Sequence, residues 1–167
     1  MTPIQALSAA WDELLVQYRR DRLPGQKEGF TARFWWSERD IVCRVACLCA
    51  QQIGWEWVHM EVSRFVGNRS VDLCLANPEP WKSLTSNDSW PTFTKHPVDL
   101  AVEFKIITID TGNPQYTPDA VNRDVDKLLK LQDAGLIRAA AVCVIDSRVN
   151  PIHPISEPKR DVTLFLA

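Results

Sequence analysis

The chain has 167 residues, a formal net charge of −2 and 46% hydrophobic residues, which are ordinary values for one globular domain. The sequence pI of about 5.9 excludes the strongly basic surface of many nucleic-acid-binding domains, so any groove for a phosphate backbone must come from local clustering of charge. No apolar run approaches the roughly 20 residues that span a bilayer. Residues 1–10 lack the pattern of a secretory signal. We therefore expect a single cytoplasmic domain over residues 1–167, without membrane contact.

Helical periodicity predicts two helices in the first third of the chain. Residues 4–20 place apolar side chains near helical spacing, and a stretch with Pro and Gly follows them. A second helix is expected over residues 37–53, because Ser37 is a good N-cap residue and Glu38 adds negative charge to the first turn. Gly54 is suited to end this helix.

Three strands are expected next. Residues 55–65 and 70–76 alternate apolar and polar side chains, which is typical of strands. Residues 77–97 are rich in turn-forming residues and predict a long loop. The alternating pattern returns over residues 98–109, which we interpret as the third strand.

A helix and two more strands complete the predicted order. The helix begins after Thr117, has Pro118 at its first position, and ends near Gly135. The apolar run 139–145 is typical of a strand that is covered on both faces. Residues 162–166 are a candidate edge strand. The order of helix, three strands, helix and strand predicts an α/β fold with a central mixed sheet and helices on both faces.

Charged residues fall on two strands of this predicted sheet. Asp72 lies opposite an apolar triplet on its strand, whereas Glu103 and Lys105 share one face of the next strand, about 6.6 Å apart along it. Phe104, between them, faces the core. Unpaired charges on a strand buried on both faces are costly, so these residues indicate a site. Asp99 is roughly 13 Å from Glu103 along the same strand, so Asp72 is preferred.

These residue types suit the hydrolysis of phosphodiesters. Asp72 and Glu103 could hold Mg²⁺ or Mn²⁺, which polarises a phosphate and activates water. Lys105 could orient that water and offset the negative charge of the transition state. A lysine close to a metal also loses proton affinity and could assist proton transfer. The alternative for the Glu-x-Lys pair is a solvated ion pair.

Three short motifs resemble those of the PD-(D/E)XK nuclease superfamily, which includes restriction endonucleases and repair nucleases. They are Val71-Asp72-Leu73, Val102-Glu103-Phe104-Lys105-Ile106, and Asp126-Lys127-Leu128-Leu129. The resemblance covers roughly residues 37–146 and implies a restriction-endonuclease-like αβββαβ core. Residues 1–30 would then be an N-terminal helical extension, and residues 147–167 a C-terminal tail or edge strand. Val71 departs from the family pattern, which expects Pro at this position.

The resemblance also implies roles for individual residues. Asp72, Glu103 and the Phe104 carbonyl would ligate Mg²⁺ or Mn²⁺, and Lys105 would be the catalytic lysine. Glu38 resembles the acidic residue that some members add to the metal site. Its alternative role is to complement the dipole of its own helix.

Two further groups of residues leave alternatives open. Arg123, Lys127 and Lys130 recur at helical spacing and could follow a phosphate backbone, although a solvated helix face is the simpler interpretation. Cys43 and its neighbours Cys47 and Cys49 fall within one predicted helix without a fourth ligand. We interpret these thiols as buried apolar residues and not as a zinc site.

The sequence thus predicts a metal-dependent nuclease. The expected substrate is DNA, in restriction, defence or repair. Cutting of both DNA strands would need two active sites, which a homodimer would provide, and a partner subunit could supply DNA affinity to a chain of acidic pI. The alternative is a catalytically inactive nuclease-like module that binds protein or nucleic acid. Trp81 and Trp90, in the predicted loop 77–97, would suit such a docking role.

Overall fold

The described part of the chain folds around a mixed sheet with strand order β1-β2-β3-β4-β5. In the computed structural model this part comprises residues 1–20, 36–62, 70–82, 96–108, 112–113, 115–148, 155 and 161–167. The first three strands pair antiparallel, and β3, β4 and β5 pair parallel. The strands are β1 (Val58–Val62), β2 (Val71–Leu75), β3 (Leu100–Ile107), β4 (Ala140–Asp146) and β5 (Val162–Leu166).

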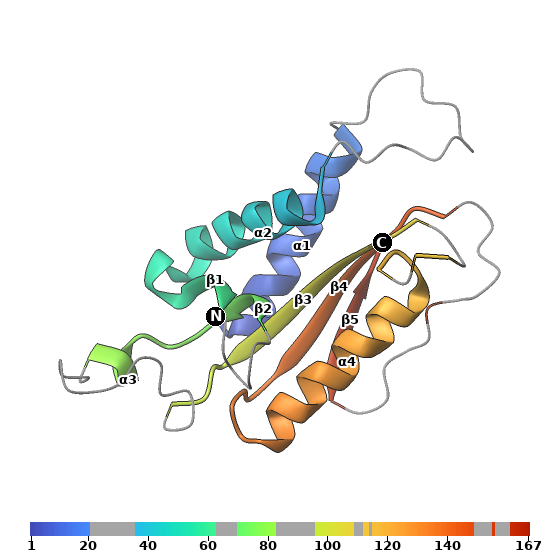
Figure 1. Cartoon of the computed structure of the whole chain (residues 1–167). Coiled ribbons are helices and arrows are strands. Elements are labelled where there is room, and N and C mark those ends of the chain that lie inside the picture. Colours follow the sequence, from blue (N-terminus) through green and yellow to red (C-terminus); the bar gives the residue numbers. More distant parts are fainter. Residues whose placement is uncertain are drawn as a thin grey trace.

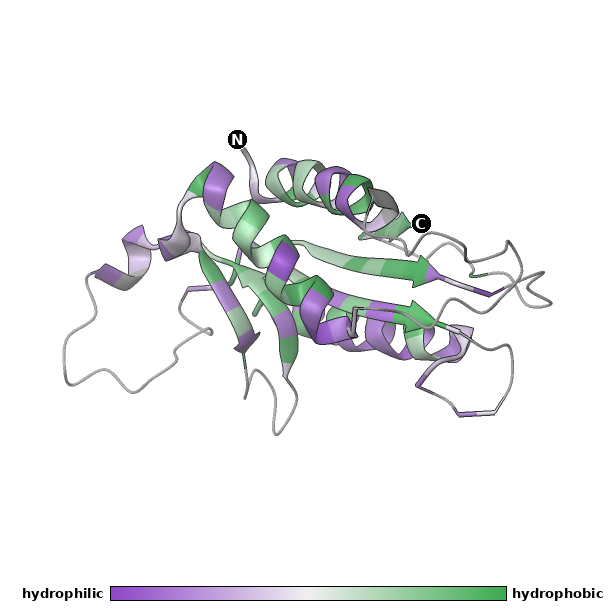
Figure 2. Ribbon diagram, turned by 90° about the horizontal axis from the view of Figure 1, so that it is seen from above, coloured by the Kyte–Doolittle hydropathy of each residue, from purple (hydrophilic) through white to green (hydrophobic). Residues whose placement is uncertain are grey.

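Helices cover both faces of this sheet (Figure 1). Helices α1 (Pro3–Arg20) and α2 (Glu38–Ile53) lie on one face, and α4 (Pro118–Asp133) lies on the other. The predicted α/β fold with a central mixed sheet and helices on both faces is confirmed at this level. Figure 2 shows the same layers from above, with mostly hydrophobic strands and helices of mixed hydrophobic and hydrophilic residues.

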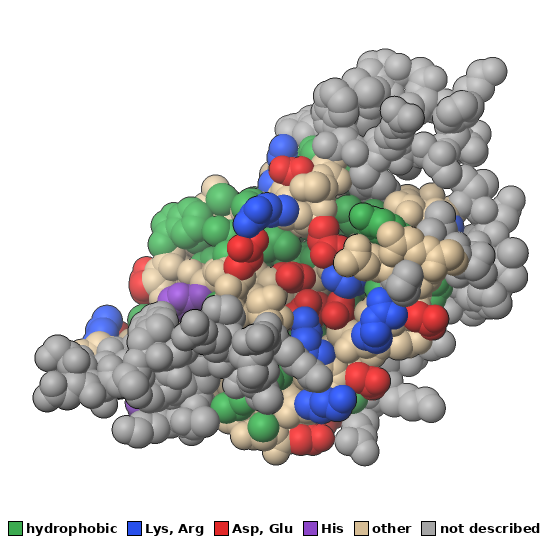
Figure 3. All heavy atoms as spheres, in the orientation of Figure 1, with side chains coloured by type: hydrophobic (Ala, Val, Ile, Leu, Met, Phe, Trp, Pro, Cys, Tyr) green, Lys and Arg blue, Asp and Glu red, His purple; other side chains and the backbone are tan. Residues whose placement is uncertain are grey.

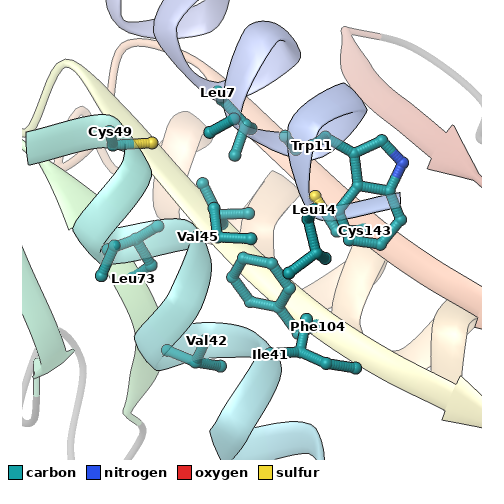
Figure 4. Packing of buried hydrophobic residues seen from close by; sticks show 14 of the residues in the cluster. Leu7, Trp11, Leu14, Ile41, Val42, Val45, Cys49, Leu73, Phe104 and Cys143 are labelled. Atoms are coloured by element: carbon teal, nitrogen blue, oxygen red, sulfur yellow. The ribbon is translucent and has the colours of Figure 1, made fainter. Parts of the chain in front are cut away.

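Two apolar clusters fill the spaces between these layers. In the first, side chains of α1 and α2 pack on β3 around Phe104, whose ring centroid lies 6.4 Å from that of Trp11 (Figure 4). In the second, Val121, Val125 and Leu128 of α4 pack on the opposite face of the sheet. Strand β4 is buried on both faces, as its continuous apolar sequence predicts.

Local sequence signals set the helix ends. The Ser37 side chain accepts a hydrogen bond from the Asp40 N–H, and the Asp40 carboxylate accepts one from the Ser37 N–H, so α2 begins with a capping box. Gly54 follows α2 at φ +97°, a conformation that favours glycine. Thr117 precedes α4 as predicted, but its side chain makes no capping hydrogen bond there. Gly135 at φ +68° follows the end of α4.

Several predicted boundaries differ from the structure. The strand predicted over residues 55–65 begins only at Val58, because Trp55–Trp57 forms a 3-10 turn. Met60 is 45% exposed because β1 is at an edge of the sheet. The loop predicted over residues 77–97 contains a short helix, α3 (Glu79–Lys82). Trp90 and residues 63–65 lie outside the described part of the chain.

From spacing alone we expect three apolar residues of β2 to share one face of the strand and four residues of α4 to be buried: Val71, Leu73 and Leu75, and Val121, Val125, Leu128 and Leu129. The structure departs from this expectation at two positions. Val71 packs with the cluster beneath α4, whereas Leu73 and Leu75 pack with the cluster beneath α2. On α4, Leu131 is buried in place of Leu129, which is only partly buried. Within the described residues, no helix is both long and apolar enough to cross a membrane.

Candidate active site

Asp72 meets the Glu-x-Lys segment at the point where β2 and β3 stop pairing through their backbones. The antiparallel ladder ends at Leu73, which pairs with Val102, so the same register would place Asp72 opposite Glu103. The Phe104 N–H instead donates to Asp72 Oδ2 at 2.9 Å. The carboxylate therefore takes the place of a backbone acceptor and lies directly beside the strand that carries Glu103.

Glu103 is buried beneath α4, with only 2% of its side chain exposed. Burial is the main cause that raises the pKa of its carboxyl to about 8, and the negative charge of Asp72 adds to it. Lys127 opposes this rise, with Nζ 2.6 Å from Glu103 Oε1. The Lys127 ammonium thus offsets the negative charge of a carboxylate oxygen that is itself buried.

Lys105 lies on the same side of β3 and is held by acidic groups from two helices. Its Nζ is 3.1 Å from Glu38 Oε1 of α2 and 3.2 Å from Asp124 Oδ2 of α4. It also donates to the carbonyl of Phe104 at 2.9 Å. Burial disfavours the charge, but Asp124 and Glu38 outweigh burial and hold the pKa of Lys105 above its ordinary value. The surrounding protein thus keeps Lys105 protonated. A nearby metal ion would have the opposite effect, because it lowers the proton affinity of a lysine.

Glu38 belongs to this cluster as well as to the first turn of α2. Its side chain is 39% exposed and faces Lys105. Burial raises the pKa of Glu38, while the ammonium of Lys105 lowers it. Glu38 therefore does more than complement a helix dipole, because it orients the lysine of the site.

Asp124 is the one member of the cluster that sequence reasoning did not select. Its carboxylate contacts Lys105 and lies 3.8 Å from Lys127 Nζ, and its side chain is only 14% exposed. A signal for it exists in the sequence, because residue 124 lies three residues after Val121 and four before Leu128, both of which face the core. An acidic residue on the apolar side of a helix indicates a buried partner.

The predicted basic stripe on α4 is divided by the fold. Arg123 and Lys130 are exposed, but the Lys127 side chain is 18% exposed and pairs with Glu103. Its Nζ also donates to the carbonyl of Ser70 at 3.0 Å. The simpler interpretation, a solvated helix face, is therefore wrong for Lys127, because this residue points into the charged cluster, and contact of the three residues with a phosphate backbone stays a prediction.

Asp99 and the cysteines lie outside the charged cluster. Asp99 accepts hydrogen bonds from the Asn77 N–H at 2.7 Å and from Arg138 at 2.8 Å, so it stabilises the other end of the strand. Cys43 and Cys47 are exposed, so their prediction as buried thiols is wrong. They lie on the outer face of α2, whereas Cys49, two residues after Cys47, is buried as predicted.

The charged cluster is suited in its chemistry to a hard divalent cation. It contains the carboxylates of Glu38, Asp72, Glu103 and Asp124, together with two lysines, which gives a formal charge of −2. Oxygen donors of this kind are the ligands of Mg²⁺ and Mn²⁺. Two of the carboxylate oxygens, Glu103 Oε1 and Asp124 Oδ2, are buried, and each has a lysine ammonium beside it. Figure 3 shows acidic and basic side chains gathered between α2 and α4.

The lysines separate these carboxylates in the structure. Among the described residues, no three His, Cys, Asp or Glu side chains converge closely enough to hold one ion as they stand. Lys105 lies between Glu38 and Asp124, and Lys127 lies between Asp124 and Glu103. The oxygen donors are of the chemical type that a hard divalent cation prefers, and in this structure the two lysines lie between them.

Comparison with models of protein families, with curated proteins and with solved structures gave no match for this chain.

Proposed function

We propose that this protein is a metal-dependent nuclease of the PD-(D/E)XK type, with a restriction-endonuclease-like core. The observation that carries the proposal is the hydrogen bond from the Phe104 N–H to Asp72 Oδ2. It fixes the acid of one strand beside the Glu-x-Lys segment of the next. A solvated ion pair would not explain this contact, nor the burial of Glu103 at 2% exposure.

Each residue of the charged cluster has a role in this proposal. Asp72, Glu103 and the Phe104 carbonyl would hold Mg²⁺ or Mn²⁺, with Glu38 at the margin. Such an ion supplies Lewis-acid stabilisation of a phosphate and favours the ionisation of water. Lys105, held protonated by Glu38 and Asp124, would donate hydrogen bonds to the attacking water or to a phosphate oxygen.

DNA is the proposed substrate, and affinity for it would come from more than this site. The negative charge of the cluster repels a phosphate backbone until a cation is bound. Exposed cations beside the site, Arg123 and Lys130 on α4, would contact the backbone. A second copy of the chain or a partner subunit would supply further basic surface.

One observation favours the second candidate, a nuclease-like module that binds without cutting. The ammonium groups of Lys105 and Lys127 already neutralise part of the carboxylate charge, so the cluster is stable as a network of ion pairs. A module of this kind needs no metal ion. Calorimetric titration with Mg²⁺ or Mn²⁺ separates the two candidates, because only the nuclease requires metal binding.

The direct test is incubation of plasmid and single-stranded DNA with the protein and Mn²⁺. We expect cleavage by the wild type and none by Lys105→Ala, with circular dichroism used to verify that the variant folds. The matched control is Lys82→Ala, which removes an exposed lysine that pairs with Glu79 on α3. Equal cleavage by wild type and Lys105→Ala would refute the assignment.

A further inference from the structure

Lys127 is enclosed within the candidate site by acceptors from three parts of the fold. Its Nζ is 2.6 Å from Glu103 Oε1 on β3 and 3.8 Å from Asp124 Oδ1 one turn earlier on α4. The same nitrogen donates to the carbonyl of Ser70, just before β2, at 3.0 Å. A lysine that merely solvates a helix face is free to extend into water, whereas this one is turned inward.

The ammonium of Lys127 covers the carboxylate that a metal ion would need. Glu103 is almost fully buried, so few directions of approach to its oxygens remain. The Oε1 atom is buried, and the Lys127 ammonium lies 2.6 Å from it. A cation that binds this oxygen must therefore share the position with Lys127 or displace it.

We propose that Lys127 is an internal counter-cation that competes with a divalent cation for Glu103 and thereby regulates metal loading of the site. This inference rests on the proposed function, because it requires that the site takes a metal ion. It differs from the expected role of Lys127 as one member of a DNA-binding stripe.

The surroundings allow Lys127 to leave Glu103. Ser70, whose carbonyl accepts from Lys127, is an exposed residue, so water can replace the lysine there. Withdrawal of the ammonium leaves four carboxylates and only Lys105, a formal charge of −3. This charge favours a divalent ion over a monovalent ammonium group.

Loss of the Lys127 charge should therefore tighten metal binding. In Lys127→Gln the side chain keeps polar contacts but no longer competes as a cation, and we expect Mn²⁺ to bind about tenfold more tightly. Lys127→Met is a second neutral variant of similar size, in case glutamine perturbs folding. Lys127→Arg keeps the charge and should bind Mn²⁺ no more tightly than the wild type.

A matched control separates local competition from a general change of charge. Lys130→Gln removes one positive charge from the same helix at an exposed position. Screening by water and salt makes such a charge much less effective than one in direct contact with Glu103. We expect the Mn²⁺ affinity of Lys130→Gln to stay within about twofold of that of the wild type.

The experiment is calorimetric titration of the full chain with MnCl₂ alone, in the absence of nucleic acid. Tighter binding by the neutral Lys127 variants than by both wild type and Lys130→Gln supports the inference, including the case in which only those variants bind Mn²⁺. Equal or weaker binding by these variants, when the wild type binds Mn²⁺, overturns the inference and leaves the proposed function in place. Absence of Mn²⁺ binding in every protein overturns both.

Discussion

Lys105 of β3 and Asp124 of α4 form an ion pair across the gap between sheet and helix, with Nζ 3.2 Å from Oδ2. Both side chains are less than a fifth exposed. The pair joins the strand that carries the Glu-x-Lys segment to the helix that covers it. Asp124 therefore helps, together with Glu38, to position the proposed catalytic lysine and to keep it protonated.

Replacement of Asp124 by Asn should weaken this control without removal of side-chain volume. The charge of Asp124 raises the pKa of Lys105 more than the charge of Glu38 does, so that pKa should fall in Asp124→Asn. Cleavage should fall about 10–100-fold, as for partners that orient the groups of a metal site. NMR titration of the lysine side chains checks the pKa. An unchanged pKa would show that Asp124 does not set the charge of Lys105.

Substitutions of Asp72 should separate its effect on the free energy of unfolding from its effect on metal affinity. Asp72→Ala leaves the Phe104 N–H without its acceptor and should lower the free energy of unfolding by about 1–3 kcal/mol. Asp72→Asn keeps a carbonyl oxygen that can accept this bond, so it should be destabilised by less. Both variants should lose Mn²⁺ affinity, because neither has the carboxylate charge. Urea unfolding and calorimetry measure the two effects, and equal stability of the two variants would contradict the structural role of the hydrogen bond.

The stability of the metal-free protein should fall as pH rises toward alkaline values. The pKa of Glu103 is raised from an ordinary value of 4.5 to about 8, so the folded state holds a proton that the unfolded state has lost. The resulting stabilisation is complete below pH 4.5 and disappears as pH rises through about 8. Its upper limit is about 5 kcal/mol, because one unit of pKa corresponds to about 1.4 kcal/mol.

Unfolding in urea at pH 5, 6.5 and 8.5 with a chelator present tests this dependence. Glu103→Gln cannot titrate, so its stability should decline less over this range than that of the wild type. Glu38→Gln is the control, because Glu38 is 39% exposed and solvent screens its charge. If Glu103→Gln and the wild type decline in parallel, the carboxyl does not titrate as the structure indicates.

Much of the architecture follows from local sequence signals. The capping box at Ser37 and the glycine at position 54 set the ends of α2, and the apolar run of β4 indicates burial on both faces. Edge positions are harder to predict, because alternation looks the same whether or not a neighbour covers the strand. Met60 is an example, because it alternates like a core residue but is exposed on the edge strand β1.

The candidate site was predictable where strand spacing decides which residues meet. Glu103 and Lys105 share a face by the two-residue period, and Asp72 comes beside them through the β2–β3 register. The burial of Asp124 and the inward orientation of the Lys127 side chain depend on how α4 packs over the sheet, which local spacing does not determine. The positions of these two charged side chains therefore follow from the tertiary structure and not from the sequence pattern.

The cysteines provide a test of the fold that is independent of function. Cys43 and Cys47 are exposed on α2, whereas Cys49, Cys74 and Cys143 are buried. Burial raises the pKa of the Cys49 thiol to about 12 and raises those of Cys74 and Cys143 well above the ordinary value, so little thiolate forms at neutral pH.

Iodoacetamide at pH 7.5 should therefore label Cys43 and Cys47 rapidly and the other three thiols only after unfolding in guanidinium. Peptide mass spectrometry of samples taken over time measures each site. The exposed pair provides an internal control for reagent activity, because both thiols lie on the same helix as the protected Cys49. Rapid labelling of Cys143 in the native protein would contradict the burial of β4 between the two helical layers, since its side chain packs in the cluster beneath α1 and α2.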